Sequence, residues 1–183
     1  ARGRAKVFAS VGPSGKLLAA GDPNPDELRA TFEEQTRALA EEDIDGLVLE
    51  TFSDLEEIGI ALAAAKATGL PVVACMVFDS GAQRDRTMMG IKPEQAAAAL
   101  AKAGADAIGS NCGWGIATFP QLARRLRQAT DLPLWLKPNA GLPKLSDGLP
   151  QYEITPAQFA VATKELVAAG ADFVGGCCGT SPD

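Results

Sequence analysis

The sequence predicts an α/β fold, specifically a (β/α)8 TIM-type barrel that is incomplete, because only about six βα units can be counted. Short apolar runs alternate with alanine-rich stretches of helical period, as expected of parallel strands and their connecting helices. The second observation is an internal repeat, in which similar stretches anchored by Asp45, Asp106 and Asp172 recur at almost equal intervals. A repeat that spans two βα units favours a barrel.

The predicted strands follow one another along the chain, and the helices between them have their own start and stop signals. The strands are predicted at Ala5–Ala9, Gly46–Glu50, Val72–Val77, Ala107–Gly109, Leu134–Lys137 and Phe173–Gly175. Prolines and early acidic residues mark four helix starts, around Pro25, Asp54, Pro93 and Pro156. Glycines stand where three helices should end, at Gly69, Gly104 and Gly170.

We expect residues 1–183 to form a single domain or a part of one. A full barrel needs eight strands and about 250 residues. The chain is therefore expected to be a fragment, or one half of a barrel that another chain completes. An open, doubly wound sheet of six strands is the alternative architecture, with a ligand site where the strand order reverses.

The composition is that of an ordinary globular domain, with 46% hydrophobic and 22% charged residues. No apolar run approaches the roughly 18 to 20 residues of a membrane-spanning helix, and the first residues do not resemble a secretory signal. A cytoplasmic protein without a membrane partner is therefore expected. The net charge of −6 argues against a nucleic-acid partner, because phosphate binding requires clustered lysine and arginine.

The chain contains no histidine, which excludes histidine-based nucleophile systems and every histidine metal site. The candidate chemistry belongs to Cys112, Cys177 and Cys178, which follow apolar runs and are flanked by glycines. Catalytic zinc typically keeps three protein ligands and one open position, and thiolates suit zinc better than they suit magnesium or calcium. A zinc site at these three cysteines is predicted in preference to a disulfide framework.

Other polar residues allow more than one role. Cys75 lies within an apolar run and is expected to pack in the core, with a fourth zinc ligand as the alternative. Glu50 ends the second predicted strand and either caps the following helix or binds a ligand. Asn139 lies between two prolines, where it either shapes a turn or contributes to a site. The stretch Ser10–Lys16 lacks the glycine spacing of a phosphate-binding loop.

Several short motifs run almost from end to end of the chain. They are Ala9–Leu17, Leu49–Asp54, Gly109–Cys112, Pro138–Pro143, Asp147–Gly148 with Tyr152 and Thr155–Pro156, and Gly175–Thr180. Each motif is weak alone, whereas the set is specific. Together they resemble the homocysteine S-methyltransferase family, and within it the barrel of the cobalamin-dependent branch. The resemblance implies a TIM-type barrel whose first two strands have no counterpart in this chain.

The resemblance also implies an activity, which is zinc-dependent methyl transfer to the thiol of homocysteine, giving methionine. The three cysteines would bind catalytic Zn2+, Glu50 would hold the ammonium group of homocysteine, and Asn111 would lie beside the metal. Ser10 and Asn139 are further candidate substrate contacts. No general base is required, because zinc coordination removes the proton from the thiol.

The Pro138–Pro143 motif resembles the cobalamin-dependent branch more than the betaine or S-methylmethionine branches, so a methylated corrinoid is the expected donor. Methylcobalamin would be carried by a separate domain or a partner protein. Two alternatives stay open. One is an incomplete barrel without activity of its own that works only with a complementing subunit. The other is a methyltransferase that acts on another thiol, or that uses betaine or S-methylmethionine.

Overall fold

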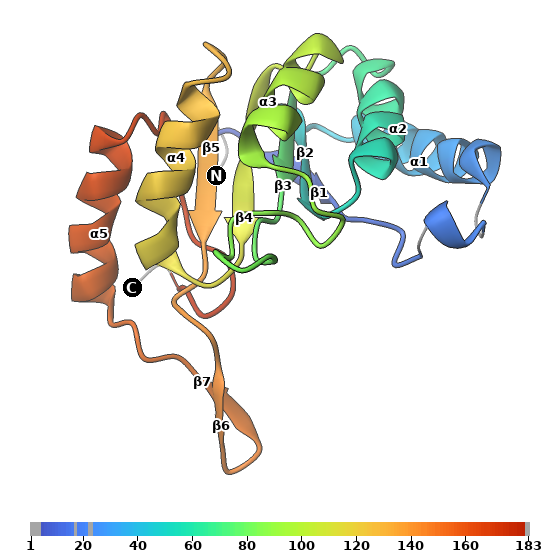
Figure 1. Cartoon of the computed structure of the whole chain (residues 1–183). Coiled ribbons are helices and arrows are strands. Elements are labelled where there is room, and N and C mark those ends of the chain that lie inside the picture. Colours follow the sequence, from blue (N-terminus) through green and yellow to red (C-terminus); the bar gives the residue numbers. More distant parts are fainter. Residues whose placement is uncertain (1–4, 17, 22–23, 182–183) are drawn as a thin grey trace.

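The computed structural model describes residues 5–16, 18–21 and 24–181. Its centre is a six-stranded parallel sheet made of β1 (Phe8–Val11), β2 (Gly46–Phe52), β3 (Val72–Met76), β4 (Ala107–Cys112), β5 (Leu134–Pro138) and β8 (Phe173–Val174). The helices are α1 (Pro25–Ala40), α2 (Leu55–Lys66), α3 (Pro93–Lys102), α4 (Phe119–Arg127) and α5 (Pro156–Ala168), with short 3-10 turns at Leu18–Ala20 and Ile116–Thr118. A hairpin of β6 (Lys144–Ser146) and β7 (Leu149–Gln151) projects beyond the carboxyl end of the sheet (Figure 1).

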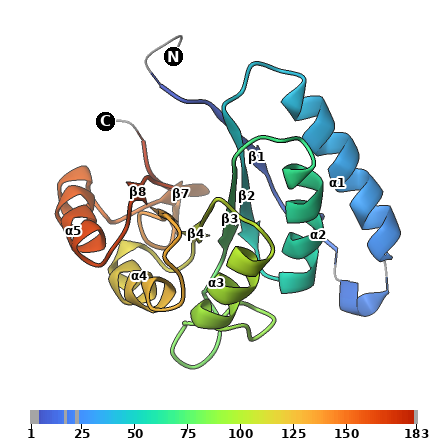
Figure 2. The same ribbon diagram turned by 90° about the horizontal axis from the view of Figure 1, so that it is seen from above.

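The strands lie in the sheet in chain order, and every neighbouring pair is parallel. The five long helices all cover the convex side of the curled sheet (Figure 2). A doubly wound sheet would need a reversal of strand order and helices on both faces. The prediction of a partial TIM-type barrel is therefore confirmed, and the doubly wound alternative is wrong.

Residues along each strand alternate between the two faces of the sheet. One set, which includes Leu49 and Ile108, packs against the helices in the main core. The opposite set forms a second cluster on the concave face, made of Val48, Val73, Cys75 and Ala107 with Phe8 and Trp135 beside it. The ring of Trp135 lies 5.5 Å from that of Phe8, although three strands separate β1 from β5 in the sheet. Contact between these rings shows how sharply the sheet curls.

The repeated aspartates tie the starts of neighbouring strands together. Each precedes a strand and accepts a hydrogen bond, 2.7 to 2.8 Å long, from a backbone N–H at the start of the neighbouring strand: Asp45 from Val7, Asp106 from Val72 and Asp172 from Leu134. Each carboxylate also pairs with a cation, which is Lys6, Lys66 and Arg127 in the same order. The sequence repeat is thus a repeated structural contact that aligns the amino ends of the strands.

The ends of several strands differ from the prediction. The first strand begins at Phe8 rather than at Ala5, because its ladder with β2 starts at the pair Phe8 and Gly46. Strands β2 and β4 extend past their apolar runs to Phe52 and Cys112, because the polar residues that follow remain in the parallel ladders. The functional motifs therefore begin inside the sheet rather than in the loops after it.

The predicted helix boundaries are confirmed. The side chain of Asp54 accepts hydrogen bonds from two backbone N–H groups in the first turn of α2. The helices α2, α3 and α5 end just before Gly69, Gly104 and Gly170, which all have positive φ. The longest helix, α1, has 16 residues. No helix in the described part of the chain is long and apolar enough to cross a membrane.

The hairpin of β6 and β7 was not predicted. Its turn consists of Asp147 and Gly148, which have φ values of 51° and 77°. Positive φ at both central residues is typical of the two-residue turn that matches the twist of a hairpin, and Asp-Gly is a preferred pair there. The pair was therefore a usable hairpin signal, although the strands beside it are only three residues long.

Gly109 is predicted to be irreplaceable in the sheet. A Cβ atom at this position would lie 1.7 Å from the carbonyl oxygen of Trp135 on the neighbouring strand. Backbone cannot move aside cheaply, so Gly109→Ala should lower the free energy of unfolding by about 1–3 kcal/mol or more. Gly59→Ala in α2 is the matched control, because nothing lies within 4 Å of its added Cβ. It should stabilise the protein by about 0.5–1 kcal/mol. Urea unfolding of both variants measures the difference, and equal stabilities would contradict the packing.

Candidate metal centre

Three thiols meet at the carboxyl end of the sheet. Cys112 is the last residue of β4, and Cys177 and Cys178 follow β8. The Sγ atom of Cys178 lies 3.8 Å from that of Cys112 and 4.0 Å from that of Cys177, and all three lie within 4.8 Å of one another. A tetrahedral zinc ion with Zn–S bonds of about 2.3 Å places its sulfur ligands about 3.8 Å apart. The donor set and its spacing therefore fit zinc.

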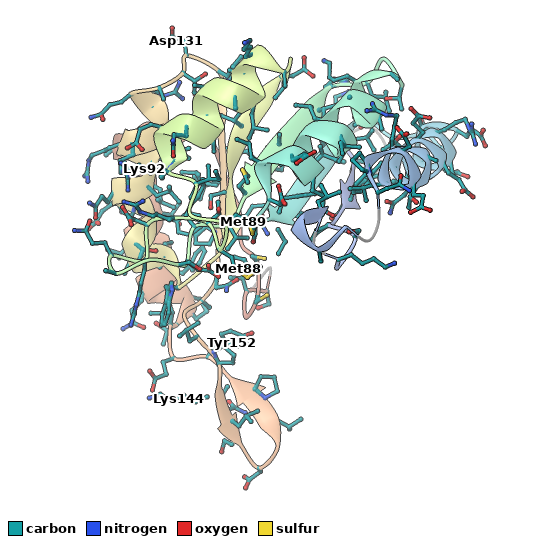
Figure 3. All side chains as sticks on the ribbon, turned by 45° about the vertical axis from the view of Figure 1, so that its right-hand side comes forward. Met88, Met89, Lys92, Asp131, Lys144 and Tyr152 are labelled. Atoms are coloured by element: carbon teal, nitrogen blue, oxygen red, sulfur yellow. The ribbon has the colours of Figure 1, made fainter. Side chains whose placement is uncertain are left out.

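The backbone around the thiols bends tightly. Cys112 has a φ of 64°, and Gly113 and Gly179 also have positive φ. The ring of Tyr152, which comes from the base of the hairpin (Figure 3), lies against Gly179, where an added Cβ would be only 2.3 Å from the ring. The hydroxyl of Thr180 closes the turn by donating to the carbonyl of Cys177 at 2.7 Å. The glycines thus allow close contacts that a larger residue would block.

Asn139 joins the two cysteine segments. Its amide nitrogen donates to the carbonyl of Gly113 at 2.9 Å, and its amide oxygen accepts from the backbone N–H of Cys178 at 2.9 Å. The side chain is buried. One of its two anticipated roles was to shape a turn, but the structure shows that it bridges the segments that hold the thiols.

Asn111 connects β4 with β2 and with the thiols. Its amide oxygen accepts from the backbone N–H of Thr51 at 2.8 Å, and its amide nitrogen donates to the Thr51 hydroxyl at 2.8 Å. The same nitrogen lies 3.8 Å from the Sγ atom of Cys177. Thr51 has a φ of 72°, which is strained for a residue other than glycine. Asn111 therefore holds a strained residue of β2 in place and stands beside the sulfur cluster.

The cluster favours a thiolate before any metal binds. A hydrogen bond from the Cys112 thiol, with a further one from Asn111, lowers the pKa of Cys177 to about 5. The same contact raises the pKa of Cys112, because its proton is shared with the neighbouring sulfur. Thiolates are the form of cysteine that binds metals, so the cluster already has one good donor at neutral pH.

Glu50 and Ser10 lie on the concave face, on neighbouring strands. The Ser10 hydroxyl donates to Oε1 of Glu50 at 2.7 Å, and the Lys137 ammonium donates to Oε2 at 2.8 Å. Asp54 caps the following helix, so Glu50 is not its cap. The sequence reasoning missed Lys137. The sequence could have indicated it, because Lys137 stands two residues after Trp135 on β5. Residues two apart on a strand share a face of the sheet, and Trp135 lies on the concave face.

Cys75 lies apart from the cluster of three thiols. It is fully buried in the concave cluster, and burial raises the pKa of its thiol. Among the described residues, the group of thiols that could hold a metal comprises Cys112, Cys177 and Cys178 without Cys75. This placement agrees with the expectation of a packed core cysteine. The cluster therefore offers three thiols, and not four, to a metal ion.

Comparison with known proteins gives consistent matches. A model of the homocysteine S-methyltransferase family matches residues 1–183. The chain is 29% identical to methionine synthase from Mycobacterium leprae (strain TN), over 97% of this chain and 15% of that protein. It is also 29% identical to betaine–homocysteine S-methyltransferase 1 from Danio rerio, over 86% of this chain and 42% of that protein.

Solved structures agree with these matches. The metallated form of the homocysteine methyltransferase MmuM from Escherichia coli superposes with a TM-score of 0.77 at 26% identity, over 98% of this chain and 59% of that one. The oxidized form of the same protein gives a TM-score of 0.73 at 28% identity. The chain thus spans less than two thirds of the length of each of these relatives.

Asn111 is predicted to contribute strongly to stability. Asn111→Ala removes two hydrogen bonds to Thr51, and each is worth about 0.5–1.5 kcal/mol. Ser110→Ala, one residue earlier on the same strand, is the control. The Ser110 hydroxyl is buried with no hydrogen-bond partner among the described residues, so its removal should leave stability unchanged or raised. Chemical unfolding of the metal-free variants tests the contrast. Equal losses of stability in the two variants would show that Asn111 does not hold Thr51 in place.

Proposed function

Because the chain belongs to the homocysteine S-methyltransferase family, we propose that it binds catalytic zinc through Cys112, Cys177 and Cys178 and activates the thiol of homocysteine for methylation to methionine. The observation that carries the proposal is the convergence of these three sulfurs at zinc-like spacing, from strands far apart in the sequence.

Zinc held by three thiolates, when bound, would lower the pKa of a fourth, substrate thiol so that it is a thiolate at neutral pH. The residues of the protein would hold the sulfur ligands in position. Asn139 and Asn111 have their amide groups already engaged with the cysteine segments and with Thr51. We therefore assign to both amides the role of orienting the sulfur ligands, since outer partners of this kind tune a metal site.

Glu50 is the proposed partner of the substrate ammonium. It is a carboxylate on the concave face, and the Ser10 hydroxyl orients it. The residue after it, Thr51, is bonded to Asn111, which in turn approaches Cys177. These links connect the segment that carries the carboxylate to the sulfur cluster, which supports a shared site for the ammonium and the thiol of one substrate. Ser10 is thereby assigned to the substrate pocket through Glu50.

The proposed donor is a methylated corrinoid carried by a partner or by a separate domain. Transfer would form a bond between the homocysteine sulfur and the methyl carbon, and would break the bond between that carbon and cobalt. The electron pair of the broken bond would stay with the corrinoid, and the thiol proton would pass to solvent. The Pro138–Pro143 motif supports this donor. Sequence identity does not distinguish between the two donors, because the chain is 29% identical both to the methionine synthase and to the betaine enzyme.

A second candidate function is a barrel segment that becomes active only with complementing strands. The specific observation is the open concave face, where Phe173 on the edge strand β8 keeps 49% of its surface exposed beside Trp135. An edge strand and an apolar patch of this kind invite pairing with further strands. In this case the chain alone would bind zinc but not homocysteine.

The zinc proposal predicts one zinc ion per chain, with loss of the ion in Cys177→Ser, because that variant retains only two of the three thiolates. Cys75→Ala is the matched control and should keep one zinc, since Cys75 lies outside the sulfur cluster. Metal analysis after dialysis gives the stoichiometry. Calorimetry of the zinc-loaded protein should then show homocysteine binding with release of the thiol proton. A wild-type protein without zinc would refute the proposal.

The donor proposal predicts that zinc-loaded protein converts homocysteine to methionine with methylcobalamin, but not with betaine or S-methylmethionine. Methionine formation with each donor can be measured by mass spectrometry, with Cys177→Ser as the inactive control. Turnover with betaine alone would assign the chain to a different branch. Binding of homocysteine without turnover by any donor would favour the need for complementing strands.

A further inference from the structure

The ion pair between Glu50 and Lys137 crosses the concave face. Glu50 lies on β2 and Lys137 on β5, two strands that are separated by β3 and β4 in the sheet. The Nζ atom of Lys137 lies 2.8 Å from Oε2 of Glu50. The lysine side chain is only 24% exposed and the glutamate side chain only 17%. Removing two charges from water costs several kcal/mol per ion, and an apolar pair is often at least as stable. Stability alone therefore gives no reason for this pair.

The position of Lys137 ties it to the sulfur cluster. In the ladder between β4 and β5, Lys137 lies opposite Asn111, and the following residues, Pro138 and Cys112, lie opposite each other. The alkyl chain of Lys137 crosses close to Gly175, where an added Cβ would be 3.2 Å from its Cγ. The ammonium group thus extends from the strand ends that carry the thiols toward Glu50.

The pair offers both charges that an amino acid needs. A zwitterion has an ammonium group and a carboxylate on the same carbon atom, and Glu50 supplies only the acceptor for the first. We infer that Lys137 binds the α-carboxylate of the amino-acid thiol, and that the resting Glu50–Lys137 pair opens so that each partner takes the oppositely charged end of the substrate. This inference rests on the proposed function and names a carboxylate site within it.

The charge balance of the site supports this exchange. Before binding, one negative and one positive side chain neutralise each other on a mostly buried surface. After insertion of a zwitterion, each of the four charges again has an opposite neighbour, so no charge is left buried and unpaired. A thiol with an amine but no carboxylate would leave the Lys137 ammonium without a partner. Its binding should therefore be weaker than that of homocysteine.

A lysine that does not contact the substrate would change the binding affinity in the opposite direction. If Lys137 only neutralised Glu50, it would compete with the substrate ammonium for the same carboxylate. Removing the lysine charge would then tighten the binding of every amine-containing thiol. The sign of the change in affinity, and its dependence on the substrate carboxylate, therefore separate the two roles.

The test is calorimetric titration of the zinc-loaded chain with homocysteine and with 3-aminopropane-1-thiol, the same molecule without its carboxylate. Wild type should prefer homocysteine by about 10- to 100-fold, the range expected for one charge-assisted hydrogen bond. Lys137→Met should abolish this preference by weakening the binding of homocysteine and not that of the amine, and Lys137→Arg should restore part of the preference. Lys144→Met is the control. Lys144 is also paired with a glutamate, Glu153, but lies on the hairpin (Figure 3).

Three results would overturn the assignment. Tighter or unchanged homocysteine binding in Lys137→Met would show competition or no contact. Equal weakening of both thiols would show a structural role, and thermal unfolding of the variant would reveal the accompanying loss of stability. A wild type that binds homocysteine without preferring it to the amine lacks a carboxylate site. By contrast, zinc-loaded wild type that binds neither thiol would refute the proposed function itself, and the inference with it.

Discussion

Register between parallel strands is the constraint on which the site depends. Parallel neighbours are joined by long crossovers, so no tight turn fixes their alignment. Asp45, Asp106 and Asp172 supply that alignment by accepting hydrogen bonds from backbone N–H groups at the starts of neighbouring strands. Once the starts are aligned, the carboxyl ends of the strands meet at one level. Thiols, amides and the charged pair then come together from residues that are far apart in the sequence.

The backbone around the thiols is strained, and buried polar contacts offset that strain. Thr51 and Cys112 both adopt positive φ, which costs of order 1–3 kcal/mol for a residue other than glycine. Asn111 accepts and donates hydrogen bonds at Thr51 and immediately precedes Cys112. The same amide therefore stabilises both the sheet and the sulfur geometry, so the fold and the site cannot be altered independently at this point.

Sequence patterns predicted the parts of the structure that depend on local chemistry. Helix caps, the glycines after the helices and the strands of alternating burial are local, and so is the grouping of Cys177 with Cys178. The pairing of Lys137 with Glu50 was out of reach, because it depends on how sharply the sheet curls between β2 and β5. The bridge made by Asn139 depends likewise on loops that meet only in three dimensions.

The curl of the sheet also gives the protein an optical property. The indole of Trp135 lies between the rings of Phe8 and Phe173, and its Nε1 atom is buried with no hydrogen-bond partner among the described residues. The sequence has two tryptophans, and the other, Trp114, donates to the carbonyl of Asp79 beneath the guanidinium of Arg84. Fluorescence of an apolar, unbonded indole depends on how well its surroundings exclude water. The emission wavelength of Trp135 therefore reports how well the concave face is shielded from water.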